Sequence, residues 1–285
     1  MEILDARNEK ELFIKLYNRY VIYAPYSIKL DESIFAGHLS EFAYDRESCI
    51  LICSLDHEHG LIHFGRHNEK DGMIYLLFAD SNQMAAEMLD IAEKWFAERG
   101  VGRVMAYLGH PSPYQYILHG SEPYCWAGNY HANNAFRRLG YDLELDILVM
   151  TKKLSSGSTE PVRAVNFDIK EEAVRDDDLA LSGLFTAFKD GIWAGRCGYH
   201  YLKALSDQLG KKTGQIEIWL NEAYHGTELS GAILAMSHAA LKDLGADRVM
   251  LATNQALFRA VKFYEKTGYE TEPIRAYSYV KILDV

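Results

Sequence analysis

Residues 245–250 read GADRVM, and residues 100–105 read GVGRVM. Each of these passages is followed by a segment that closes with GY, at residues 268–269 and at residues 140–141. In both places an amphipathic helix pattern comes before the first glycine, and an apolar strand and a second helix come after it. Because the same order of elements recurs at long spacing, the sequence predicts a duplicated domain.

The two copies differ in length. Gly100 and Gly140 are 40 residues apart, whereas Gly245 and Gly268 are 23 residues apart, so the first copy carries 17 extra residues. We assign the insertion to residues 109–128, which are rich in proline, glycine and aromatic residues. A long aromatic loop of this kind forms either a binding wall or an interdomain packing loop, and the sequence leaves both open.

Length and composition fit two folded domains. The chain has 285 residues, of which 48% are hydrophobic, enough for two cores of ordinary size. Residues 152–161, KKLSSGSTEP, have a linker composition. We therefore predict an N-terminal domain at residues 1–153, a linker at residues 154–161 and a C-terminal domain at residues 162–285.

Charge and hydropathy limit the classes of partner that we expect for this protein. No apolar run approaches the roughly 20 residues of a membrane helix, and the first residues show no signal-peptide pattern, so we expect a cytoplasmic protein without a membrane partner. The net charge of −10 argues against a nucleic-acid partner. Four scattered cysteines predict buried free thiols rather than a disulfide framework or a metal site. A monomer and a homodimer both remain open.

The pattern of elements is α/β. In the first half it predicts helices at 9–23, 84–99 and 131–139 and strands at 48–55, 60–65, 72–78, 104–108 and 143–150. In the second half it predicts strands at 165–169, 215–220, 249–253 and 277–283 and helices at 229–244 and 256–266. An acidic helix start at Asp176–Asp178 and a mostly helical stretch over 180–209 complete the prediction, which leaves little room for a strand hairpin there.

Two passages carry a family resemblance. Residues 220–231, LNEAYHGTELSG, follow a strand and open a helix, and residues 253–269, TNQALFRAVKFYEKTGY, run from an asparagine through a helix to a closing GY. Together they resemble the GNAT superfamily of N-acetyltransferases over roughly residues 214–285; the first half is similar in element order only. The resemblance implies two GNAT-like domains, each a mixed, mostly antiparallel sheet flanked by helices. It also implies direct transfer of an acetyl group from acetyl-CoA to a primary amine of a small molecule or peptide.

The first passage supplies the expected coenzyme site. Where a short loop of small residues connects a strand to a helix, unpaired backbone N–H groups lie at the positive end of the helix dipole, and a diphosphate fits there. The resemblance assigns coenzyme binding to residues of both passages: Leu220, His225, Gly226, Thr227, Leu229, Ser230, Gly231 and Asn254. His225 stands where the family has Arg or Gln, and Glu228 and Ser230 stand where glycine or alanine is usual. The carboxylate of Glu228 repels a diphosphate unless it turns away.

The catalytic candidates follow from the second passage and the strand before the first. The resemblance makes Tyr264 the general acid that protonates the departing thiolate. Its counterpart in the first half is Phe136, which has no proton to donate, so we expect the coenzyme in the second half alone. Glu217 is the best-placed general base, ahead of Glu222 and of the histidines at 200, 225 and 238.

Aromatic side chains mark the expected acceptor site. Trp193 and Tyr199 lie in the cluster WAGRCGYHY at residues 193–201, and Tyr114 and Trp126 lie in the insertion. Ligand pockets favour such linings, so we expect these four to contact the substrate. Two alternatives remain open: a non-catalytic binding module that has lost the coenzyme, and aminoacyl transfer from tRNA, against which the negative charge argues.

Overall fold

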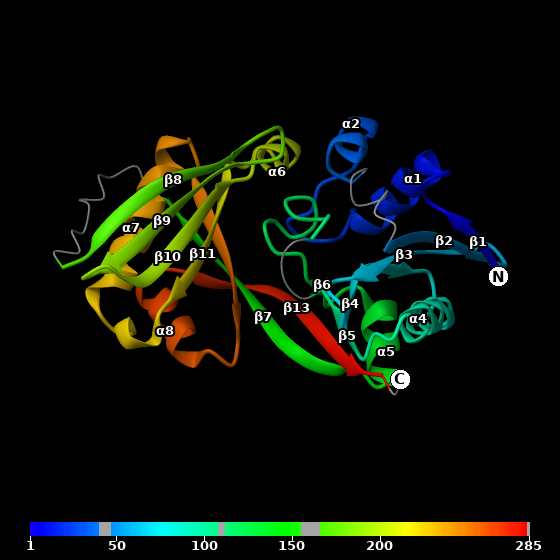
Figure 1. Ribbon diagram of the computed structural model, residues 1–285. Coiled ribbons are helices and arrows are strands. Elements are labelled where there is room, and N and C mark those ends of the chain that lie inside the picture. Colours follow the sequence, from blue (N-terminus) through cyan, green and yellow to red (C-terminus); the bar gives the residue numbers. More distant parts are fainter. Residues whose placement is uncertain (40–46, 108–111, 155–165, 284–285) are drawn as a thin grey trace. The chain divides into compact units, whose positions relative to one another are not determined.

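The computed structural model describes residues 1–39, 47–107, 112–154 and 166–283 (Figure 1). The chain forms two compact units. Unit 1 contains Met1–Leu148, Asn254–Ala256 and Ile274–Val285, and unit 2 contains Val149–Thr253 and Leu257–Pro273. The predicted linker lies outside the described residues from position 155 onward, as do residues 109–111 of the insertion, and the predicted domain boundaries stay a prediction.

Unit 1 begins with a strand and a helix and continues with a three-stranded meander. Its elements are β1 (Glu2–Asp5), α1 (Lys10–Val21), α2 (Glu32–Ile34), the π-helical turn η1 (Phe35–Leu39), β2 (Ser48–Leu55), β3 (Glu58–Arg66), β4 (Asp71–Ala79), α4 (Asn82–Ala97), β5 (Arg103–Ala106), β6 (Cys125–Trp126) and α5 (Tyr130–Arg138). The helices and strands predicted for the first half are confirmed, with boundaries shifted by a few residues.

Strands β1 to β4 of unit 1 are antiparallel neighbours, and β5 joins β4 in parallel. Helix α4 covers this sheet with the apolar face that its sequence spacing predicted, since Met84, Met88 and Phe96 are fully buried. Gly60 and Gly72 in the strands below make this packing possible. A Cβ atom on either glycine would collide with the side chain of Met88 or Phe96.

Unit 2 contains the second set of elements. They are β8 (Asp168–Asp176), β9 (Leu181–Lys189), β10 (Ile192–Tyr201), α6 (Lys203–Leu209), β11 (Thr213–Leu220), the 3-10 turn η2 (Glu222–Tyr224), α7 (Glu228–Asp243), β12 (Arg248–Asn254) and α8 (Phe258–Lys266). Strands β8 to β11 are antiparallel neighbours, β12 joins β11 in parallel, and α7 packs on β9, β10 and β11 (Figure 1).

Two long strands belong to both units. Strand β7 (Asp142–Lys153) passes from unit 1 to unit 2 after Leu148, and β13 (Glu270–Ile282) passes from unit 2 to unit 1 after Pro273. The far end of β13 pairs with β5 in unit 1, from Tyr279 with Ala106 to Ile282 with Arg103. Each unit therefore holds a mixed, mostly antiparallel sheet with helices on it, which confirms the predicted fold class.

Two predictions for the second half are wrong. The mostly helical stretch over 180–209 is instead a hairpin of β9 and β10 followed by the short helix α6. Its turn is Asp190-Gly191, and both residues have positive φ, 53° and 78°. Such a pair is the strongest short-range signal for a two-residue hairpin, and the helical interpretation overlooked it.

The expected helix start at Asp176–Asp178 is a tight turn between β8 and β9. There Oδ1 of Asp177 accepts hydrogen bonds from the N–H groups of Leu179 and Ala180, at 2.8 and 3.1 Å. Aspartate bonds turn backbones in this way as readily as it caps helices, so its presence alone does not distinguish the two.

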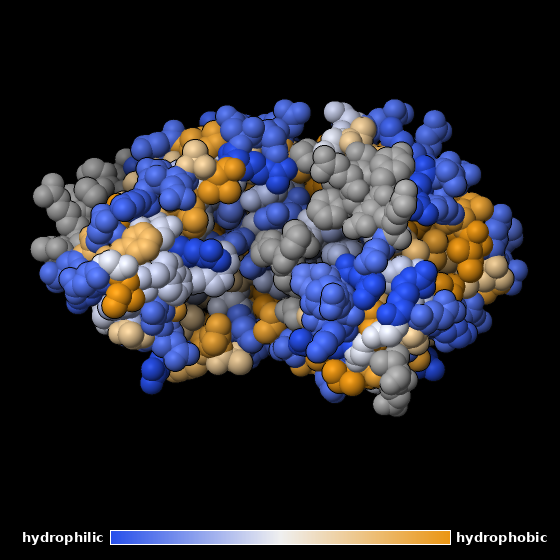
Figure 2. Space-filling model, in the orientation of Figure 1, coloured by the Kyte–Doolittle hydropathy of each residue, from blue (hydrophilic) through white to orange (hydrophobic). Residues whose placement is uncertain are grey.

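The face of the molecule in Figure 2 is mostly hydrophilic, with hydrophobic side chains in small separate groups. Among the residues with described positions, no helix is long and apolar enough to cross a membrane. Each of the four cysteines is a free thiol.

Candidate active site

Strands β11 and β12 pair over only part of their length. The parallel ladder runs from Thr213 with Arg248 to Gln215 with Met250, although β11 continues to Leu220 and β12 to Asn254. The burial of β11 changes at the same place: residues 213–216 are buried, and residues 217–220 are half-buried. The carboxyl ends of the two strands thus no longer pair with each other, and the end of β11, residues 217–220, is partly accessible.

The loop after β11 leads into a long helix whose first turn is exposed. Gly226 has a φ of 78°, which disfavours a residue with a side chain, and a Cβ atom placed there would meet nothing within 4 Å. Thr227 caps α7, because its Oγ1 accepts a hydrogen bond from the N–H of Leu229 at 3.4 Å. His225, Gly226 and Thr227 are exposed. The positive end of this 16-residue helix therefore lies at an exposed loop that an anion can reach, although the N–H of Leu229 is already bonded to Thr227.

Glu228 is the residue of this loop that disfavours a diphosphate by its charge. Its Oε1 accepts a hydrogen bond from Nδ2 of Asn166 at 3.3 Å. Leu229 is fully buried, so it can offer a ligand only its backbone, whereas Ser230 is half-buried and donates to the carbonyl oxygen of Thr227 at 3.3 Å. Gly231 has open space around it. The predicted loop residues thus lie together at one helix terminus.

The candidate general base lies on β11 where the strands separate. The side chain of Glu217 is 10% exposed, and its Oε1 lies 3.7 Å from Nε2 of His200, which is also 10% exposed. The other ring nitrogen of His200 lies 2.9 Å from the hydroxyl of Ser182. Three adjacent strands, β9, β10 and β11, thus line up a hydroxyl, an imidazole and a carboxylate on one face of the sheet.

Register explains this alignment. His200 pairs with Ser182 on one side and with Gln215 on the other, and Glu217 pairs with Gly198. Opposite and alternate residues share a face, so Ser182, His200 and Glu217 all point the same way. Sequence reasoning named His200 only as one of several histidines, because no local pattern reveals which residues two neighbouring strands place side by side.

Tyr264 lies on α8 and is 9% exposed. Its ring packs edge-to-face against Tyr269, with ring centroids 5.7 Å apart. Asn254 ends β12, and its Oδ1 accepts a hydrogen bond from the N–H of Ala256 at 3.0 Å, which starts the turn before α8. The packing of Asn254 groups it with unit 1.

The four predicted acceptor contacts are not brought together within one unit. Trp193 is the second residue of β10, is 39% exposed, and its carbonyl oxygen accepts from Nδ2 of Asn221 at 3.3 Å. Tyr199 points to the sheet face opposite Glu217, where its hydroxyl donates to Glu171 at 2.5 Å. Of the four, Trp193 alone lies exposed beside the loop that opens α7.

The remaining two belong to unit 1. Tyr114 is fully buried, stacks on Tyr17 with ring centroids 6.3 Å apart, and its hydroxyl lies 3.1 Å from Nδ1 of His63. Trp126 is half-buried in β6, beside Ala276 of β13. Their acceptor roles stay predictions, and the burial of Tyr114 favours a packing role.

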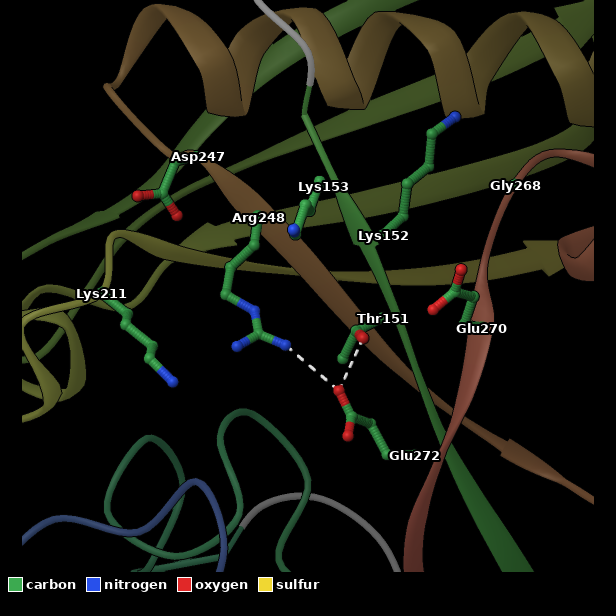
Figure 3. A pocket seen from close by; sticks show the side chains of 9 residues that line it. All are labelled: Thr151, Lys152, Lys153, Lys211, Asp247, Arg248, Gly268, Glu270 and Glu272. Atoms are coloured by element: carbon green, nitrogen blue, oxygen red, sulfur yellow. Dashed lines mark hydrogen bonds and ion pairs between the residues drawn. The ribbon is translucent and has the colours of Figure 1, made fainter.

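Unit 2 also has a cavity of about 730 Å³ at the opposite ends of β11 and β12 (Figure 3). Glu272 accepts hydrogen bonds there from Arg248 at 3.2 Å and from the hydroxyl of Thr151 at 2.7 Å. The lining mixes both charges, with Lys152, Lys153, Lys211, Arg248, Asp247, Glu270 and Glu272. None of the predicted site residues lines it. No group of three or more potential metal ligands gathers within the part of the chain that the structure describes.

Comparison with known proteins agrees with this geometry. The model of the acetyltransferase (GNAT) family matches residues 149–269, which include β11, the loop, α7, β12 and α8. Uncharacterised N-acetyltransferases of Mycobacterium tuberculosis and Mycobacterium bovis are 38% identical over 61 residues, which is 21% of this chain. The chain spans about two fifths of the length of these curated relatives, 39%.

Solved structures match the whole fold. A tandem GNAT protein from the clavulanic acid biosynthesis pathway has a TM-score of 0.67 at 9% identity, covering 99% of this chain and 98% of its own. A glucosamine N-acetyltransferase region of a fungal multi-domain β-N-acetylglucosaminidase has a TM-score of 0.70 at 13% identity, covering 98% of this chain and 38% of its own.

The fold is therefore that of a tandem GNAT protein, with two copies in one chain. Residues 149–269 of this chain are similar to the acetyltransferase (GNAT) family.

Proposed function

We propose that the chain is an N-acetyltransferase that transfers the acetyl group of acetyl-CoA directly to a primary amine in unit 2. The observation that carries the proposal is the separation of β11 from β12 beside the exposed first turn of α7. An extended thioester arm can lie between separated strands and use their backbone groups, while its diphosphate lies at a helix N-terminus. The matching relatives are named N-acetyltransferases, which supports the reaction class.

The loop residues suit the coenzyme. Gly226 and Gly231 leave open space next to the first N–H groups of α7, and the carboxylate of Glu228 is hydrogen-bonded to Asn166. Acetyl-CoA supplies the activated thioester as the second substrate. The amine nitrogen attacks the thioester carbon, the C–S bond breaks, and an amide forms.

Two proton transfers accompany this exchange. Glu217 accepts the proton that the attacking amine loses, and the ring of His200, whose Nε2 lies 3.7 Å from Oε1 of Glu217, is placed to take that proton on from the carboxyl group. Tyr264 donates a proton to the departing thiolate, which leaves free coenzyme A. Glu217 gains one proton and Tyr264 loses one, and exchange with solvent then returns both groups to their starting states.

Trp193 supplies an exposed aromatic surface for the acceptor, a small-molecule or peptide amine. A cytoplasmic location and the absence of nucleic-acid and membrane partners stay predictions from composition.

Isothermal titration calorimetry with acetyl-CoA tests the proposal, followed by an amine panel monitored by thiol release. We expect micromolar binding and turnover with at least one class of primary amine. No binding up to millimolar acetyl-CoA would contradict the enzyme and favour a binding module that has kept only the scaffold.

A further inference from the structure

Unit 1 repeats the strand arrangement of the proposed coenzyme site. Strands β4 and β5 pair in parallel from Asp71 with Arg103 to Ile74 with Ala106, and β4 then continues to Ala79 paired with β3 but no longer with β5. The two ladders even begin alike. The carbonyl oxygen of Lys70 accepts from the N–H groups of residues 102 and 103, and that of Lys212 accepts from those of residues 247 and 248. A second coenzyme could therefore be expected beside β4.

In unit 1 the side chain of Tyr107 occupies the place beside β4. At Tyr107, directly after β5, the backbone takes a φ of 55°, which is unusual for an aromatic residue. The Tyr107 hydroxyl accepts a hydrogen bond from the N–H of Leu77 at 2.7 Å and donates one to the carbonyl oxygen of Leu77 at 3.1 Å. Nδ2 of Asn129 donates to the same carbonyl oxygen at 2.8 Å.

These hydrogen bonds occupy the backbone N–H and carbonyl groups of Leu77, which lie at the strand edge that the thioester arm of a coenzyme would need. A backbone N–H that already donates to a buried hydroxyl has no second proton for a ligand amide. Tyr107 is 2% exposed, and its burial raises the pKa of the phenol well above the ordinary value, so the hydroxyl keeps its proton. The second half of β4 is correspondingly buried throughout, from Leu76 to Ala79.

The helix terminus of unit 1 is occupied as well. Ser81 caps α4 by accepting from the N–H of Met84 at 3.1 Å, and its hydroxyl donates to Glu58 at 2.5 Å. Asp80 accepts from the N–H of His59 at 2.8 Å and is ion-paired with Arg19. Carboxylates of the chain therefore lie where a diphosphate would have to bind, and their charge repels it.

Unit 2 differs at the strand edge. Its helix α7 is also capped by a hydroxyl, that of Thr227, and carries the carboxylate of Glu228, but the loop at residues 225–228 is exposed, whereas residues 80–82 of unit 1 are half-buried. The residue seven positions after Gly245 is Ala252, just as Tyr107 comes seven positions after Gly100. Strand β12 continues through Ala252 to Asn254 instead of turning back, and residues 217–220 of β11 stay half-buried. Among the described residues, this copy is the one in which a partly accessible strand end lies before an exposed loop at a helix N-terminus.

We propose that Tyr107, with Asn129, closes the coenzyme groove of unit 1 from within, so that the chain binds one acetyl-CoA, in unit 2. The inference rests on the proposed function for the identity of the ligand, and the closure itself rests on the hydrogen bonds of Leu77. Unit 1 then serves as a scaffold whose former groove is part of its core.

Two measurements test the two parts separately. Calorimetry of the full chain should give one acetyl-CoA per chain, and hydrogen exchange with the coenzyme present should show new protection in residues 217–231 and none in residues 76–85. A stoichiometry of two, or protection in residues 76–85, would overturn the proposal. Absence of any binding would contradict the proposed function instead.

Hydrogen exchange of the ligand-free protein tests the closure without the coenzyme. We expect the Leu77 amide to exchange slowly in the wild type and at least tenfold faster in Tyr107→Phe, which loses only the hydroxyl. Tyr17→Phe is the matched control, because this fully buried hydroxyl has no hydrogen-bond partner among the described residues. An equal Leu77 exchange rate in the wild type and in Tyr107→Phe would overturn the closure.

Discussion

Nε2 of His238 and the hydroxyl of Tyr269 lie 2.7 Å apart in the core of unit 2. His238 is on the buried face of α7, and Tyr269 directly follows Gly268, which closes α8. The contact ties the helix on the sheet to the segment that enters β13. Burial, together with the smaller effect of the nearby ammonium group of Lys152, lowers the pKa of His238 from 6.5 to about 4, so the imidazole is neutral in the folded protein.

This pair predicts a loss of stability in mild acid. Between pH 6.5 and pH 4 the unfolded chain binds a proton at His238 and the folded chain does not, so the free energy of unfolding falls as the pH falls. The slope is at most about 1.4 kcal/mol per pH unit for each such histidine. Urea unfolding at pH 7, 6 and 5 measures it, and His238→Gln should reduce it. An unchanged slope in this variant would show that His238 is not a source of the effect.

Tyr264→Phe should lower kcat and leave the affinity for acetyl-CoA unchanged. The variant keeps the ring that packs on Tyr269 and removes only the proton donor. General acid catalysis contributes roughly 10²- to 10⁴-fold, so we expect a loss of that order. Steady-state kinetics and calorimetry check the two quantities. A variant with wild-type kcat would remove Tyr264 from the mechanism.

Glu217→Gln should lower kcat/KM at neutral pH by about 10²-fold, because the glutamine cannot accept the proton of the amine. The deficit should shrink as the pH approaches the pKa of the acceptor amine, since more of the amine is then already neutral. The control is Glu222→Gln, an exposed carboxylate in the turn after β11. Equal losses in both variants at every pH would indicate a general electrostatic effect rather than a base.

Local patterns were sufficient for much of the fold. The spacing of Met84, Met88 and Phe96 predicted α4, and the matching glycines at positions 100 and 245 predicted two copies. The hairpin of β9 and β10 was missed because its apolar residues were interpreted with a helical period, although Asp190-Gly191 marked the turn. Strands β7 and β13 each run from one unit into the other. This arrangement depends on pairing between distant segments, which no local pattern encodes.

The candidate site, too, could be predicted from the sequence only where its residues are contiguous. The loop from His225 to Gly231 is contiguous, so a linear motif could predict it. The contact of Glu217 with His200 depends on the register of two strands, and the closure by Tyr107 depends on a backbone turn of positive φ. The substrate contact of Tyr114 stays a prediction, because an aromatic residue in a loop packs into a core as readily as it contacts a ligand, and Tyr114 is fully buried.

Gly226→Ala should weaken the binding of acetyl-CoA. The backbone of Gly226 has a φ of 78°, and a side chain in this region costs roughly 1–2 kcal/mol, so the loop will relax to another conformation and move the N–H groups at the start of α7. If that whole cost opposes binding, the Kd rises about 5- to 30-fold.

Gly210→Ala is the matched control for this change. Gly210 ends α6 with a φ of 62°, and a Cβ atom there also meets nothing within 4 Å. Both variants should lose similar stability in thermal unfolding, but only Gly226→Ala should bind acetyl-CoA more weakly in calorimetry. Equal Kd values for the two variants would mean that the loop before α7 does not hold the coenzyme, and the anion site would then have to be sought elsewhere in unit 2.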